Sequence, residues 1–233
     1  METSSTRTIV DLPELRDRVK VFRNREHAGE ILAGMLESYQ SPKAIILAIP
    51  AGGVPVAAAC AERLELPFDV VVVSKITLPW DSEAGYGAVA FDGTVRLNND
   101  LLRGLGLTKQ EIQQGIDKTL QKVRRRVRGL RGGRVFPALS RRLVIVGDDG
   151  LASGFTMHVA VEALEKAGAN RIIVAVPTGH AHAVRKIAQE VEAVYCANIR
   201  SSWAFGVADA YEQWSDVDEE ELARLVKSVV AEV

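Results

Sequence analysis

Five short, continuous apolar runs rich in valine and isoleucine recur along the chain, at residues 43–49, 68–74, 143–146, 171–176 and 194–197. Strands buried on both faces have this texture, because helices cover a parallel sheet on each side. Segments with apolar residues at helical spacing alternate with the runs, at residues 24–39, 55–64, 154–166, 183–190 and 219–230. The alternation predicts an α/β fold built on a doubly wound parallel sheet.

Composition limits the classes of protein that this fold can serve. The 233 residues are 47% hydrophobic and 25% charged, which is typical of a globular chain and excludes a wholly disordered one. No apolar run approaches the roughly 18–20 residues that a membrane helix needs, and residues 1–7 lack a signal pattern. We therefore expect one cytoplasmic domain over residues 1–233, with no membrane partner. Cys60 and Cys196 lie in apolar surroundings and resemble buried thiols.

Two segments depart from the alternation. Residues 77–97 are rich in glycine, proline and aromatic residues, and predict an excursion from the sheet with a turn at Asp92-Gly93. Thr108 and Glu111 have capping-box spacing and open a long helix that Gly132-Gly133 ends. Residues 1–20 are polar and predict a partly loose start of the chain.

Charge is unevenly distributed. Residues 108–142 contain 11 lysines or arginines against 2 acids, whereas residues 209–233 contain 8 acids against 2 bases. A solvated helix face is the first interpretation of the basic block. An anion-facing surface, for nucleic acid or for an acidic neighbouring subunit, is the second. The net charge of −1 argues against a dedicated nucleic-acid binder, so we do not expect nucleic acid as a partner.

The chemistry is concentrated after the third apolar run. Asp148 and Asp149 end that run, and a small-residue turn with the hydroxyls of Ser153 and Thr156 then opens a helix. Backbone N–H groups at a helix start bind phosphate, and carboxylates accept hydrogen bonds from sugar hydroxyls or hold a hydrated Mg²⁺. The alternative is a turn and helix cap with no ligand. If the turn binds phosphate, valine at Gly154 should cost ligand affinity more than stability.

This run resembles the phosphoribosyl-pyrophosphate signature of the type I phosphoribosyltransferase family. Blocks at residues 22–25, 50–57 and 75–90 are similar to an uncharacterised phosphoribosyltransferase-like branch of it. The resemblance implies a parallel core with a small hood, at about residues 76–97 and 198–215, and a basic helical insertion at about 98–135. It also implies a homodimer.

The resemblance implies an enzyme that transfers 5-phosphoribose from phosphoribosyl pyrophosphate to a nucleobase-like acceptor, with Mg²⁺. Asp148 and Asp149 would hold the ribose hydroxyls and the metal, and Lys75 would supply catalytic charge. Ala51, Gly52 and Gly53 would bind pyrophosphate. The 5′-phosphate would lie against the turn formed by Leu151, Ala152, Ser153, Gly154, Phe155 and Thr156.

The base is expected at an aromatic residue near the C-terminal end. Trp203 matches the family position that stacks on the base, with a core aromatic as the alternative. Tyr86 is interpreted as a packing residue, and the four histidines as loop or structural residues without metal-ligand spacing.

Three departures from the family pattern leave the function open. In relatives that act on 6-oxopurines an aspartate often occupies the position of Ala152, and its absence argues against that class of acceptor. The related branch carries arginine where this chain has Ala51, and Gly147 replaces the usual aliphatic residue before the acids. The enzyme is the first hypothesis. The alternative is a non-catalytic regulator that senses phosphoribosyl pyrophosphate or a nucleotide and contacts nucleic acid.

Overall fold

The computed structural model describes residues 8–231, apart from the side chains of residues 82, 83, 230 and 231. Six strands form a central sheet in the order β1-β9-β8-β7-β2-β3, and every neighbouring pair is parallel. The strands are β1 (Thr8–Val10), β2 (Ala44–Ala48), β3 (Phe68–Val70), β7 (Leu143–Gly147), β8 (Arg171–His180) and β9 (Ala193–Arg200).

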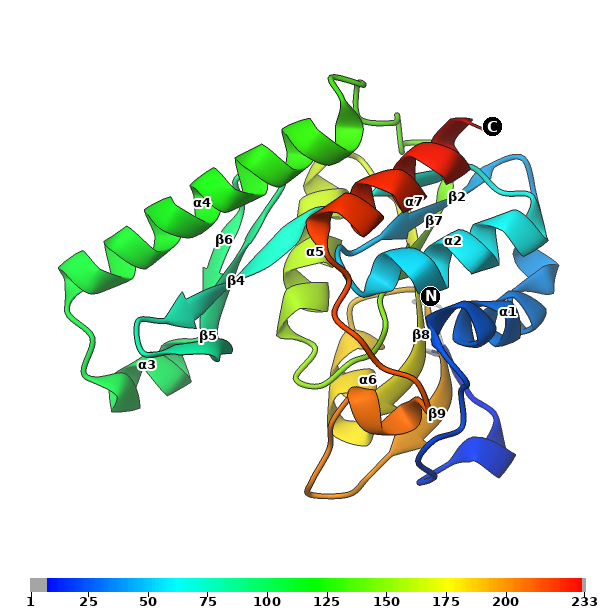
Figure 1. Ribbon diagram of the computed structural model, residues 1–233, viewed down its shortest axis with the longest axis horizontal. Coiled ribbons are helices and arrows are strands. Elements are labelled where there is room, and N and C mark those ends of the chain that lie inside the picture. Colours follow the sequence, from blue (N-terminus) through cyan, green and yellow to red (C-terminus); the bar gives the residue numbers. More distant parts are fainter. Residues whose placement is uncertain (1–7, 232–233) are drawn as a thin grey trace, which may run out of the picture.

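Helices cover both faces of this sheet, which confirms the doubly wound α/β fold (Figure 1). One apolar core joins the sheet to α1 (Arg25–Met35), α2 (Gly53–Leu64) and α7 (Glu219–Ala231). A second core joins the opposite face to α5 (Phe155–Lys166) and α6 (Ala181–Ile187). Because both faces are covered, the inner strands β2 and β7 are buried at every residue and read as continuous apolar runs, whereas the edge strand β1 is mostly exposed.

A second, antiparallel sheet has the order β4-β5-β6, with β4 (Val73–Leu78), β5 (Asp81–Ala90) and β6 (Val95–Leu97). The single strand expected over residues 68–74 is therefore wrong: its first half pairs in the central sheet as β3, and its last residues begin β4. Both halves are buried, so an apolar run alone does not reveal that the pairing partner changes between them.

The insertion at residues 98–135 contains two helices, α3 (Asn99–Leu105) and α4 (Lys109–Arg131). The Thr108 and Glu111 capping box is present and Gly132 ends α4, as predicted. α4 covers the small sheet, and the two together project from the body (Figure 1). Tyr86 is fully buried beneath α4, where a Cβ at Gly115 would lie only 2.1 Å from the Tyr86 hydroxyl. Its interpretation as a packing residue is confirmed.

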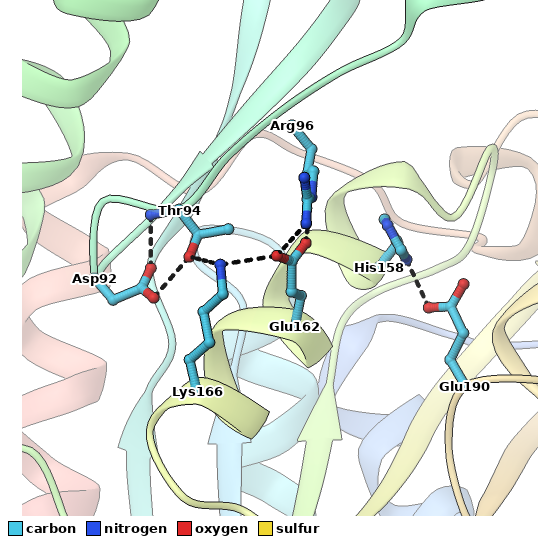
Figure 2. A network of polar contacts seen from close by, with 7 residues as sticks. All are labelled: Asp92, Thr94, Arg96, His158, Glu162, Lys166 and Glu190. Atoms are coloured by element: carbon cyan, nitrogen blue, oxygen red, sulfur yellow. Dashed lines mark hydrogen bonds and ion pairs between the residues drawn. The ribbon is translucent and has the colours of Figure 1, made fainter.

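A polar network ties the small sheet to α5 (Figure 2). Arg96 on β6 donates two hydrogen bonds to Glu162 on α5, at 2.5 and 2.6 Å, and Lys166 lies 2.8 Å from the same carboxylate. Lys166 also donates to Thr94 at 3.0 Å, in the turn predicted at Asp92-Gly93. This network holds the small sheet against the helix that begins at the candidate phosphate turn.

The start of the chain, expected to be partly loose, contains one short strand. Residues 8–10 form β1 at the edge of the sheet, in register with β9, while residues 1–7 lie outside the described range. A strand of only three residues is too short to show the alternation of apolar and polar residues by which a strand is predicted from sequence. Cys60 and Cys196 are buried free thiols, and burial raises the pKa of Cys60 to about 12. Across residues 8–231, no helix has the length and apolar character needed to cross a membrane.

Candidate active site

The carboxyl ends of β2 and β7 place two loops side by side at one edge of the sheet, because Ala48 pairs with Gly147. The glycine loop after β2 lies directly against the acids after β7. A Cβ at Gly52 would lie 1.8 Å from Asp149 Oδ2, and one at Gly53 would lie 2.8 Å from Asp148 Cα. Both positions therefore need glycine. Ala51, joined to Pro50 by a cis peptide bond, begins this loop and is half-buried.

Arg25, at the start of α1, holds the second acid. Its Nε and Nη2 both lie 3.0 Å from Asp149 Oδ2, and the Arg25 side chain is only 9% exposed. Asn24 caps α1 by accepting a hydrogen bond from the His27 N–H, as predicted, and so sets where Arg25 begins the helix.

The segment after β9 closes over this ion pair. Arg25 Nη1 donates to the Ser215 carbonyl at 2.7 Å, and its guanidinium lies over the Trp214 ring, 3.8 Å from the centroid. The Tyr211 hydroxyl donates to the Asp149 carbonyl at 2.7 Å. Sequence reasoning did not assign Arg25, Tyr211 or Trp214 to the site. The available signal was an arginine directly after a helix-capping asparagine, on a helix whose other face is apolar.

The two acids have different electrostatic surroundings. Burial raises the pKa of Asp148 well above its usual range, and the neighbouring charge of Asp149 raises it further. Burial also raises the pKa of Asp149, but Arg25 opposes that rise. Within residues 8–231, no salt bridge joins Asp148 to a cation. Asp149 is thus neutralised inside the protein, whereas Asp148 is the acid left for an external hydroxyl or cation.

Lys75 extends the site from the second sheet. It lies on β4 with an exposed side chain, and its charge is close enough to oppose the rise in the pKa of Asp148. The structure therefore brings Lys75, Asp148, Asp149 and the glycine loop together, although they come from three separate strands.

The turn from Leu151 to Thr156 follows the acids. Leu151 is buried and bonds to β8 through the Thr178 carbonyl, while Ala152 and Ser153 are exposed. Ser153 Oγ accepts from the Phe155 N–H at 3.3 Å. The first-turn N–H groups of α5 have no acceptor within the helix, so this exposed turn offers donors to an anion.

Gly154 adopts a left-handed conformation with φ +74°, and its Cβ would lie 3.3 Å from Ile187 Cγ1. The expectation that Gly154→Val costs affinity more than stability stays a prediction, but the conformation adds a stability cost of its own. The left-handed backbone strains any larger residue there, whether or not a ligand is bound.

Trp203 lies in the segment after β9, and its side chain is fully exposed. The alternative of a core aromatic is therefore wrong. Among the histidines, His180 ends β8, accepts from the His182 N–H, and packs edge-to-face on Phe205 with centroids 5.7 Å apart. His158 pairs with Glu190 at 2.7 Å (Figure 2), which supports a structural role.

A family model described as the phosphoribosyl transferase domain matches residues 95–212. The chain belongs to this family. A "putative phosphoribosyl transferase" of Mycobacterium tuberculosis is 32% identical to this phosphoribosyl transferase domain over 204 residues, covering 88% of this chain and 46% of that protein. The chain thus spans about half the length of the curated relatives it matches.

Among solved structures, the crystal structure of TT1426 from Thermus thermophilus is similar over 89% of this chain and 98% of that one. The two have 29% sequence identity and a TM-score of 0.71. This phosphoribosyl transferase domain therefore shares its fold, over most of its length, with a protein of nearly the same extent.

Proposed function

We propose that this phosphoribosyl transferase domain transfers 5-phosphoribose from phosphoribosyl pyrophosphate to a ring nitrogen of a purine, a pyrimidine or a similar heterocycle. The observation that carries the proposal is the direct contact between the Gly52-Gly53 loop and the Asp148-Asp149 pair, beside the turn at residues 151–156. Phosphoribosyl pyrophosphate carries a phosphate on one side of its ribose hydroxyls and a diphosphate on the other. The turn at residues 151–156 and the Gly52-Gly53 loop lie on either side of the acids and can bind these two groups.

Each part of the site has a proposed role. Asp148 accepts hydrogen bonds from the ribose hydroxyls, and Asp149, held by Arg25, keeps the strand end in place beside it. The turn at residues 151–156 binds the 5′-phosphate. The N–H groups of residues 51–53 bind pyrophosphate, with Lys75 as the nearby cation. Trp203, fully exposed after β9, stacks on the base.

The reaction breaks the bond between C1′ and the pyrophosphate oxygen, whose electron pair leaves with pyrophosphate. The acceptor nitrogen attacks C1′ with its lone pair and releases its proton to solvent. Positive charge develops on the sugar, so the protein contributes by aligning the reactants and by stabilising the departing anion. The glycine loop and Lys75 perform the second task. Residues 76–97 and 198–215 form the hood that excludes water from the reacting sugar.

The acids of the site suit a Mg²⁺ ion that is held mainly by the substrate. The described residues contain no group of three acids, histidines or cysteines that could hold a metal by themselves. Two carboxylates, one of them already paired with Arg25, suit an ion that keeps waters and is bound mainly through substrate phosphates. Such an ion would neutralise the charge of the leaving pyrophosphate. Asp148 is the residue that would contact it.

A second function is favoured by Ala51. The loop carries no side-chain cation there, and a site that binds the ligand without turning it over would serve as a sensor. Both functions require binding of phosphoribosyl pyrophosphate, but only transfer releases pyrophosphate.

The test is incubation of the purified chain with labelled phosphoribosyl pyrophosphate, Mg²⁺ and a panel of bases. Release of pyrophosphate with one base supports transfer, and binding without release supports the sensor. Asp148→Asn should abolish binding and keep the fold, because the asparagine oxygen can still accept from the Asp149 N–H, as the carboxylate does at 2.8 Å. Asp117→Asn, an exposed acid on α4, is the matched control. Unchanged affinity in Asp148→Asn would refute the assigned site.

Replacing both acids at once, as Asp148→Asn/Asp149→Asn, is a poorer test than replacing Asp148 alone. Asp149→Asn would leave the buried Arg25 without its charged partner and lower the stability of the domain, so a loss of binding could not be assigned to the site alone. The single variant at Asp148 separates ligand binding from stability.

A further inference from the structure

The outer face of α4 carries a concentrated positive charge that the proposed function does not use. Residues 118–128 contain six basic residues and no acid. Five of the six are exposed, and we call them the basic ridge: Lys118, Lys122, Arg124, Arg125 and Arg128. α4 covers the small sheet (Figure 1), and the five side chains of the ridge are exposed to solvent.

Other arginines of the same block attach α4 to the body. Arg126 Nε donates to Glu219 on α7 at 2.8 Å. Arg131 and Arg134 lie 3.1 and 3.7 Å from the carboxylate of Asp69 on β3. By contrast, no residue of the basic ridge forms a salt bridge with any acid in residues 8–231. The fold therefore uses the neighbouring arginines and leaves the ridge unpaired.

The arrangement of the ridge is unfavourable for an isolated helix. Lys118 and Lys122, and likewise Arg124 and Arg128, are like charges four residues apart, which destabilises a helix. The pKa of Lys122 is lowered by burial and then by Arg126, Arg125 and Lys118, with only Glu219 opposing. An external anion would relieve this repulsion. The packing of α4 does not itself require positive charge at these positions.

Two hollows flank the ridge. One, of about 600 Å³, is lined by Arg124, Arg125 and Arg128 together with Phe91 and Gln121. The other, of about 500 Å³, lies between α4 and α7 and is lined by Lys122, Arg125 and Arg126 together with Glu219, the partner of Arg126. Arg125 borders both. A convex ridge between two open hollows suits an extended polyanion that contacts both flanks, rather than a small anion enclosed on all sides.

We propose that the basic ridge binds the phosphate backbone of a nucleic acid. The ridge rises about 15 Å along the α4 axis. A nucleic-acid duplex of that length presents roughly nine phosphates. That density matches five unpaired cations better than the scattered carboxylates of an acidic protein surface do. Three of the five are arginines, whose forked N–H donors fit phosphate oxygens. The net charge of −1 hid this surface, because acids elsewhere in the chain cancel it in the sum.

The experiment measures the salt dependence of binding by fluorescence anisotropy with the full chain. The probes are a labelled 20-base-pair DNA duplex, the same duplex in RNA, and one RNA strand alone. Five phosphate contacts predict that the logarithm of the association constant falls with log[salt] at a slope of about −4.5 for duplex DNA. Raising NaCl from 50 to 200 mM should then weaken binding about 500-fold.

The variant Arg124→Gln/Arg125→Gln/Arg128→Gln should reduce the slope by about 2.7. A charge-matched control, Arg18→Gln/Arg103→Gln/Arg185→Gln, removes three exposed arginines from other surfaces and should leave the slope nearly unchanged. Circular dichroism and binding of phosphoribosyl pyrophosphate should be the same in both triple variants, so this test does not depend on the proposed function.

Three outcomes would overturn the proposal. The first is that none of the three probes binds. The second is that the two triple variants lose affinity equally, because the attraction would then belong to no particular surface. The third is that light scattering shows a self-associated wild-type chain, which only the ridge variant dissociates and which none of the probes displaces. In that case the ridge would be an interface with the acids of a second copy.

Discussion

Replacing the buried Arg25 should destabilise the domain more than replacing an arginine at the surface. Its guanidinium makes two contacts with Asp149 Oδ2 at 3.0 Å and donates to the Ser215 carbonyl at 2.7 Å. The two side chains are 9% and 17% exposed, so Arg25→Leu would leave a carboxylate buried without its partner. The stacking on Trp214 would be lost as well.

The magnitude follows from the burial of the pair. Breaking a buried ion pair by removing one partner costs about 3–5 kcal/mol. In a domain of this size each kcal/mol corresponds to about 2–4 °C in Tm, so we expect Tm to fall by about 6–20 °C. Arg23→Leu is the matched control, because Arg23 lies two residues away, is 66% exposed, and reaches Glu30 only at 3.9 Å. A surface pair of that kind contributes at most about 1 kcal/mol.

The assay is thermal unfolding followed by circular dichroism, arranged as a double-mutant cycle with Asp149→Asn. The double variant Arg25→Leu/Asp149→Asn should be more stable than Arg25→Leu alone, because neither charge is then left unpaired. The reasoning is refuted if Arg25→Leu melts within about 2 °C (about 1 kcal/mol) of the Arg23→Leu control. It is equally refuted if the effects of the two substitutions add.

Three further predictions concern individual residues. The pKa of Glu162 is lowered to about 2 by Arg96 and Lys166, so its stabilising contribution is complete above pH of about 4.5 and is lost as the pH falls toward 2. Because solvent screens this pair, we expect about 1–2 kcal/mol, which urea titrations should show in the wild type and not in Glu162→Gln. Gly154→Ala should lower Tm, because a φ of +74° costs alanine about 1–2 kcal/mol. Gly34→Ala, at an open position of α1, should raise Tm. Equal shifts in Tm for the two variants would contradict the backbone argument. Ala51→Arg should tighten pyrophosphate binding about 10- to 100-fold in calorimetry by adding a charge-assisted contact, and no gain would mean that Lys75 and the loop N–H groups suffice.

Much of the architecture is local in origin and could be read from the chain. The valine-rich runs predict buried strands because burial on two faces removes the need for polar residues on either. Asn24 and the Thr108 and Glu111 pair predict helix starts, because each cap bonds to residues within three positions of itself. The acid pair and the turn behind it are also consecutive in the chain. Most of these elements begin within two residues of their expected first residue. The strands β8 and β9 continue four and three residues beyond their expected ends, and residues 68–74 divide between two strands.

Features that join distant parts of the chain could not be read in this way. Arg25 and Asp149 are 124 residues apart, and nothing in the spacing of either predicts the other. The division of residues 68–74 between two sheets follows from their pairing partners, because residues 68–70 pair with β2 whereas β4 pairs with β5 and packs against α4. The need for glycine at Gly52 comes from the carboxylate that the neighbouring strand places beneath it.

The basic block shows where the two kinds of information separate. The sequence by itself determined that a capped, strongly basic helix runs from Thr108 to the glycines at 132–133, because capping and charge are properties of adjacent residues. Only the tertiary structure decided which arginines that helix uses internally, by bringing Asp69 and Glu219 to Arg131 and Arg126. Charge pairing depends on distance in space, and the fold alone sets those distances. For the same reason, the site acids were recognisable in the chain, but their unequal roles follow from Arg25 reaching only one of them.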